Sequence, residues 1–167
     1  PELAEIHYNL GHFLQESGRL TEAIACYEKA ISINPGYADA YSNCGNALKA
    51  LQCLEEAHTK YDQAIALRPD VETYRTNKAL AYLLMGDYKK GWPLFEYRTG
   101  HGDYLIAPRN FEQPLWLGAE SLAGKTILLH AEQGFGDTIQ FCRFAAEVKQ
   151  LGARVLLETP APLISVL

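Results

Sequence analysis

The sequence predicts an all-α solenoid of three helix pairs, followed by the first strand, helix and strand of an α/β unit. Two observations predict this order. A helix-pair pattern recurs every 34 positions up to about residue 98, and the chain then changes to two short apolar runs around a helical stripe. We therefore divide the chain into a repeat region at 1–99, a linker at 100–121 and a partial α/β segment at 122–167.

The 34-residue period is visible without a gap when residues 4–37 are laid over residues 38–71. Small, aromatic and proline residues recur at fixed places: Gly11 with Gly45, Ala23 with Ala57, Tyr27 with Tyr61, Ala30 with Ala64, and Pro35 with Pro69. We expect the small residues to let the two helices of a pair approach closely, and the tyrosines to fill the space between them. The prolines should end each second helix, because proline cannot continue it.

A third, less regular copy spans residues 72–98. Ala79 takes the glycine place, Gly91 the first alanine place and Phe95 the tyrosine place. Pro93 lies inside the second helix, and no proline comes after it at the expected place. We expect residues 91–98 to form the last helix, adapted to end the array or to dock on the C-terminal part of the chain.

This pattern resembles the tetratricopeptide repeat (TPR), whose period is 34 residues. The resemblance covers residues 4–98 and rests on the period, the small residues, the aromatic residue and the proline together. It implies a stack of helix pairs with a concave face, in which a protein or peptide partner binds.

Asn9, Asn43 and Asn77 occupy the same place in the three copies. Asparagine is a mediocre helix former, so three in register need a reason. In a TPR this place faces the concave groove, and an amide both donates and accepts, so we expect these residues to bind a peptide backbone. The repeats of protein O-GlcNAc transferases resemble this ladder, and "AYSNCGNALK" at 40–49 is similar to them. The alternative is that the asparagines are solvated residues kept by duplication.

The segment after the linker predicts a strand–helix–strand unit. "TILLHA" at 126–131 is predicted to be a buried strand, and "EQGFGD" at 132–137 the loop after it. Apolar residues at helical spacing continue up to Gly152, and 153–160 is a second predicted buried strand. Ligands of parallel sheets bind beyond the strand ends, near a helix N-terminus, so this loop is a candidate site.

The run "GKTILLHAEQGFGDTIQFCRFAAEVKQLGARVLLE" resembles the start of glycosyltransferase family 9, the ADP-heptose:lipopolysaccharide heptosyltransferases, and most of all its TPR-fused members. The resemblance implies a Rossmann-like lobe and a nucleotide-sugar donor, with direct displacement that needs no metal. It implies that Asp137 is the general base on the acceptor hydroxyl, with Gln133, Gly134 and Gly136 at the substrate. His130 stands where the family more often has arginine, which leaves the acceptor open. The alternative for Asp137 is the N-cap of the helix.

Composition excludes several classes. The formal net charge of −5 argues against nucleic-acid binding, and no apolar stretch approaches the ~20 residues of a membrane span. No signal-peptide pattern is present at the start. The four cysteines form no CxxC pair and have no histidines at zinc spacing, so we expect free thiols in the cytoplasm and no metal site: Cys26, Cys44, Cys53 and Cys142.

Because the chain opens on Pro1 and stops inside the apolar run "APLISVL", we expect it to be part of a longer protein. The sugar-nucleotide lobe that the resemblance implies would lie downstream, so residues 1–167 alone should hold no cofactor and turn nothing over. Three functions stay open. The first is a peptide-binding module of a bacterial TPR-linked glycosyltransferase, the second a TPR adaptor with a catalytically dead α/β remnant, and the third an enzyme like the O-GlcNAc transferases.

Overall fold

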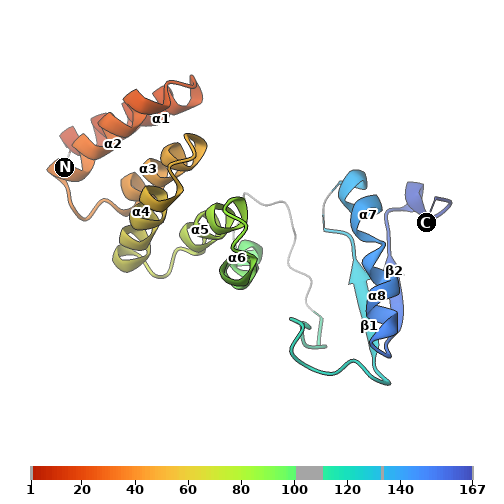
Figure 1. Ribbon diagram of the computed structural model, residues 1–167. Helices are drawn as coiled ribbons and strands as arrows, with labels where there is room; N and C mark the ends of the chain where they lie inside the picture. Colours follow the sequence, from red (N-terminus) through yellow and green to blue (C-terminus); the bar gives the residue numbers. More distant parts are fainter. Residues whose placement is uncertain (1, 101–110, 133, 167) are drawn as a thin grey trace. The chain divides into compact units, whose positions relative to one another are not determined.

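The computed structural model describes residues 2–100, 111–132 and 134–166 (Figure 1). The chain divides into two compact units, residues 1–104 and 105–167, and each is described by itself. In the parts of the chain that are described, no helix is both long and apolar enough to cross a membrane.

The first unit is a stack of three helix pairs, as the 34-residue period predicts. Each pair consists of two successive helices in close contact, and neighbouring pairs pack through α2 with α3 and through α4 with α5 (Figure 1). The helices are α1 (Glu2–Glu16), α2 (Leu20–Ile33), α3 (Ala38–Ala50), α4 (Leu54–Leu67), α5 (Glu72–Leu84) and α6 (Tyr88–Phe95).

Glycine and tyrosine pack directly against each other inside a pair, as expected. A Cβ added to Gly11 would lie 2.8 Å from Cε1 of Tyr27, and one added to Gly45 would lie 2.7 Å from Cε1 of Tyr61. Both tyrosine side chains are fully buried. Their hydroxyls still donate hydrogen bonds, Tyr27 to Gln15 Oε1 at 3.1 Å and Tyr61 to Asn46 Oδ1 at 2.9 Å. The rings therefore fill the space between the helices, while their polar ends stay paired.

The first helix of each pair is followed, two residues after its end, by a residue in the left-handed region. These residues are Gly18 (φ 75°), Gln52 (φ 63°) and Gly86 (φ 77°), which occupy the same place in the three repeats. The following residue donates its backbone N–H back to the helix in each case, as Cys53 does to the carbonyl of Leu48 at 3.0 Å. The turn geometry is thus maintained along the array even where glycine is replaced by glutamine.

The last helix begins three residues before the predicted start of 91. Asp87 accepts a hydrogen bond from the backbone N–H of Lys90 at 3.2 Å and so caps α6 at its N-terminus. Pro93 lies inside α6, which ends at Phe95 and continues as the 3₁₀ helix η1 (Glu96–Gly100). Pro93 has no backbone N–H, so one hydrogen bond of the α-helical pattern is missing within α6.

The second unit contains a parallel pair of strands, β1 (Thr126–His130) and β2 (Arg154–Glu158), with Thr126 opposite Arg154 and His130 opposite Glu158. The predicted order of strand, helix and strand is present. The sheet has only these two strands in the described residues, fewer than a Rossmann-like domain has, so the Rossmann-like lobe stays a prediction. The strands are also far less buried than predicted, since Leu128 is 38% and Leu156 46% exposed.

The helical stripe between the strands forms two helices, not one: α7 (Phe135–Phe141) and α8 (Phe144–Gln150). At the break, the N–H groups of Ala145 and Ala146 bond to the carbonyls of Cys142 and Arg143, three residues back. Bonds to the residue three positions back are typical of a 3₁₀ turn and interrupt the α-helical pattern, in which each N–H bonds four residues back. A small core of Leu122, Val148 and Ala153 holds the unit together, and the 3₁₀ helix η2 (Ala161–Leu163) comes after β2.

Candidate functional site

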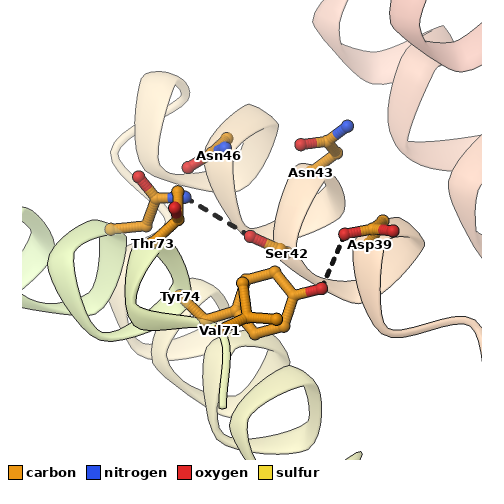
Figure 2. A pocket seen from close by; sticks show the side chains of 8 residues that line it. Asp39, Ser42, Asn43, Asn46, Val71, Thr73 and Tyr74 are labelled. Atoms are coloured by element: carbon orange, nitrogen blue, oxygen red, sulfur yellow. Dashed lines mark hydrogen bonds between the residues drawn. The ribbon is translucent and has the colours of Figure 1, made fainter. Parts of the chain in front are cut away.

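A polar pocket of about 500 Å³ lies between the first helices of the second and third repeats, α3 and α5 (Figure 2). Its lining is Asp39, Ser42, Asn43, Asn46, Val71, Thr73, Tyr74 and Asn77. Seven of these eight side chains carry a polar atom, and valine is the exception. The pocket therefore suits a ligand that offers hydrogen-bonding groups.

Two of the three predicted asparagines meet in this pocket. Asn43 comes from α3 and Asn77 from α5, and both are half-buried. Asn9 lies exposed on α1 and is not part of the lining. The structure thus brings together Asn43 and Asn77, but not all three residues.

Asn43 and Asn77 are each bonded to the preceding repeat. Asn43 Nδ2 donates to the hydroxyl of Tyr8 at 2.9 Å, and Asn77 Nδ2 donates to the hydroxyl of Ser42 at 3.3 Å. Both bonds join residues 35 positions apart. The alternative of merely solvated side chains therefore does not describe Asn43 and Asn77, although it fits the exposed Asn9. Peptide binding by the three residues stays a prediction.

Asp39 and Tyr74 are pocket residues that sequence reasoning missed. The Tyr74 hydroxyl donates to Asp39 Oδ1 at 2.6 Å, again across 35 positions (Figure 2). Burial, followed by the bond to this carboxylate, raises the pKa of Tyr74, so its hydroxyl keeps its proton. The signal that could have found this pair is the spacing itself, because hydrogen-bonded polar residues 35 apart occur three times in the first helices.

Tyr8 is held in its neutral form as well. Partial burial and then the negative charge of Asp39 raise its pKa. A neutral hydroxyl has lone pairs to accept the N–H of Asn43 and a proton of its own to donate. The link between the first and second repeats is therefore a neutral hydrogen bond.

The glycine loop of the second unit places its predicted residues at the start of α7. Gly134 is the N-cap residue (φ 32°, ψ 145°), and Gly136 and Asp137 lie in the first turn, both exposed. Gln133 lies outside the described residues. Because the N-cap is Gly134, the alternative that Asp137 caps the helix is wrong. Its carboxylate instead lies near the loop, with Oδ2 3.7 Å from the position of a Cβ added to Gly134.

His130 ends β1 at the same edge. Its Nδ1 is buried without a hydrogen-bond partner among the described residues, and its ring lies 6.0 Å from that of Phe111. The described residues include no group of His, Cys, Asp and Glu that could hold a metal ion. The catalytic and substrate-binding roles of Asp137, Gly134 and Gly136 stay predictions.

Two family models match the first unit. A TPR repeat model matches residues 14–52, and a tetratricopeptide repeat model matches residues 38–71. No curated protein matches the chain.

Solved structures with this fold include MamA, with 26% identity and a TM-score of 0.54. The match covers 56% of this chain and 55% of MamA, so the chain spans only about half of that protein. The Sgt2 TPR domain from Aspergillus fumigatus is 26% identical with a TM-score of 0.55, over 58% of this chain and 64% of that domain.

The first TPR of Spaghetti (RPAP3), solved with the HSP90 peptide SRMEEVD, is 20% identical with a TM-score of 0.56. That match covers 57% of this chain and 76% of the Spaghetti chain, and at this identity it shows the fold alone. The family models and the solved structures agree that the chain contains tetratricopeptide repeats and that its first unit is a TPR-like solenoid.

Proposed function

We propose that the first unit is a peptide-binding module and that an extended segment of the partner lies in the pocket between α3 and α5. The observation that carries this proposal is the polar lining from two successive repeats, in which Asn43 and Asn77 both take part. A TPR of the same fold has been solved with a bound peptide, which supports the proposal by analogy.

The two asparagines come from helices whose side chains bond to each other, since Asn77 donates to Ser42. A peptide in the pocket can therefore contact both α3 and α5. Side-chain amides can bind the backbone of any such peptide, because every residue has a C=O group and every residue except proline has an N–H group.

Selection from a library of randomised seven-residue peptides tests the proposal. The variant Thr73→Trp should fill the pocket, since Thr73 lines it and its side chain makes no hydrogen bond to the described residues that would be lost. Thr21→Trp, at an exposed position of α2 where the side chain likewise makes no hydrogen bond to the described residues, is the matched control. We expect peptides selected by the unmodified chain and the control to be lost with Thr73→Trp. Equal binding by all three proteins would contradict the proposal.

We further propose that the α/β segment is the beginning of a glycosyltransferase family 9 lobe in a longer protein. Its support is the parallel strand–helix–strand order, the left-handed Gly134 at the helix start and the exposed Asp137 in the first turn. In this proposal the TPR array recruits the acceptor, and Asp137 takes the proton of its hydroxyl.

Transfer by the full-length protein from a panel of sugar nucleotides tests this second proposal. Asp137→Asn should abolish transfer, whereas Glu147→Gln, an exposed acid on α8, should retain it. Transfer by Asp137→Asn at the rate of the unmodified protein would contradict the role of Asp137 as general base. No transfer from any donor would favour the non-catalytic adaptor.

A further inference from the structure

We infer that the α3–α5 pocket selects basic peptides, in which Lys and Arg outnumber Asp and Glu, and rejects acidic ones. This inference rests on the proposed peptide-binding function of the same pocket and names the class of its partner. It follows from the charges and hydrogen bonds of the lining residues.

Asp39 is the one charged side chain in the pocket lining. No lysine, arginine or histidine lines the pocket, and Tyr74 is neutral because its pKa is raised. The hydrogen bond from Tyr74 fixes Asp39 Oδ1 beside the pocket but leaves the negative charge of the carboxylate in place. The lining therefore has a formal charge of −1.

The nearby cations are engaged elsewhere. Arg68 is within electrostatic range of Asp39 but binds Asp70, with Nη2 3.2 Å from Oδ2. Lys78 of α5 pairs with Asp62. Among the described residues, Asp39 forms no ion pair, so its charge is open to a cation from a ligand.

The amide of Asn43 adds an acceptor at the same place. Its nitrogen is turned toward Tyr8 of the preceding repeat, and Figure 2 shows its oxygen on the opposite side of the side chain. That oxygen accepts no hydrogen bond from the described residues. Asp39 and Asn43 are four residues apart on α3, which places them on one face about 6 Å apart along the axis.

A peptide can therefore donate a backbone N–H to Asn43 while a side chain one or two residues away reaches Asp39. A lysine or arginine there forms a charge-assisted hydrogen bond. A glutamate or aspartate would instead meet a like charge that no cation of the pocket lining offsets, and such contacts reject the wrong partner. The peptide SRMEEVD, bound in the Spaghetti structure, has three acidic residues against one arginine and should fit this pocket poorly.

The test uses the 167-residue chain, the same randomised peptide library and two capped competitors, SRMEEVD and SRMKKVK. The first readout is the ratio of Lys and Arg to Asp and Glu in the peptides that Thr73→Trp fails to bind. The second is competition for the selected pool. We expect enrichment of basic residues and competition by SRMKKVK at an about tenfold lower concentration than by SRMEEVD. Asp39→Asn, which keeps an oxygen for Tyr74, should reduce that difference to about twofold.

The outcomes separate the two claims. This inference would be overturned if the peptides that depend on the pocket were not enriched in Lys and Arg. It would also be overturned if Asp39→Asn left that enrichment unchanged. In both cases the peptide-binding function would stay intact. No peptide sensitive to Thr73→Trp would overturn the proposed function and this inference with it. Thermal unfolding of Asp39→Asn verifies that the variant is folded.

Discussion

Asn43 of the second repeat donates a hydrogen bond of 2.9 Å to the hydroxyl of Tyr8 in the first, and Asn77 repeats this bond to Ser42 one repeat further on. Asn43 and Asn77 therefore both line the pocket between α3 and α5 and connect neighbouring repeats. Substitution of Asn43 or Asn77 should for this reason change the free energy of unfolding as well as the binding of a ligand.

The Asn43–Tyr8 bond should be measurable as a coupling energy. We expect Tyr8→Phe and Asn43→Ala each to lower the free energy of unfolding, and the double variant to show a coupling of about 0.5–1.5 kcal/mol. Urea unfolding of the four proteins gives this value. Tyr41→Phe is the matched control, because no hydrogen bond joins the half-buried Tyr41 to Asn43. A coupling near zero for Tyr8 would show that the bond contributes nothing.

Gln52→Gly should stabilise the first unit. Gln52 has φ 63° at the place where the other repeats have Gly18 and Gly86, and a side chain is strained in this region. The gain in the free energy of unfolding should be about 0.5–1 kcal/mol, since glycine also has more entropy to lose on folding. Gln52→Ala, measured in the same urea titration, should give no gain. An equal effect of both substitutions would point to loss of the glutamine side chain instead of relief of backbone strain.

Gly45→Ala should destabilise the second helix pair. Its Cβ would lie 2.7 Å from Cε1 of the fully buried Tyr61, which has no room to move. Overpacking of this kind costs about 1–3 kcal/mol. Gly36→Ala is the control, because its Cβ would lie 3.4 Å from the nearest atom, Asn34 Oδ1, at the surface. Thermal melts should separate the two variants, and identical melting temperatures would contradict the close packing of α3 on α4.

His58 should make the stability of the first unit depend on pH. Its side chain is buried, both ring nitrogens lack a hydrogen-bond partner among the described residues, and the ring lies 3.9 Å from that of Tyr82. Burial, followed by the charge of Lys78, lowers the pKa of His58. The surrounding charges are those of Glu55, Asp62, Lys78 and Lys90.

Because the folded pKa is lowered, the unfolded chain binds the proton first as the pH falls below about 6.5. The contribution of His58 is complete above that pH and is lost as the pH drops toward the folded pKa. We expect the free energy of unfolding to decrease from about pH 7 to about pH 5, and His58→Phe to reduce this slope. The substitution should also add about 1–3 kcal/mol at neutral pH, since it removes two unpaired polar atoms. An unchanged slope in urea titrations would contradict this assignment.

The helix pairs could be predicted because they depend on short-range spacing. Gly11 and Tyr27, or Gly45 and Tyr61, lie 16 residues apart in successive copies, and this fixed distance already implies two helices in contact. The resemblance to TPRs then gave the groove its expected place in the first helices. A pocket lies between two of these first helices, α3 and α5, and peptide binding in it stays a prediction.

The remaining features depend on long-range geometry. The hydrogen bonds of Asn43, Asn77 and Asp39 depend on how the first helix of one repeat is aligned with the first helix of the next. The spacing of 35 positions can be interpreted as a hydrogen bond only when this alignment is known. The break after Phe141 leaves the apolar stripe intact, so periodicity could not detect it. The exposure of Leu156 in β2 reflects how few elements cover the two strands.

The most direct test of the peptide-binding account is NMR of the chain labelled with ¹⁵N-asparagine, titrated with a basic peptide from the library. The side-chain amides of Asn43 and Asn77 report on the pocket, and that of Asn34, in the turn between α2 and α3, is the internal control. We predict that the signals of Asn43 and Asn77 shift together and saturate, while that of Asn34 stays in place. Peptide binding with both pocket signals unmoved would contradict the account, because the partner would then bind elsewhere.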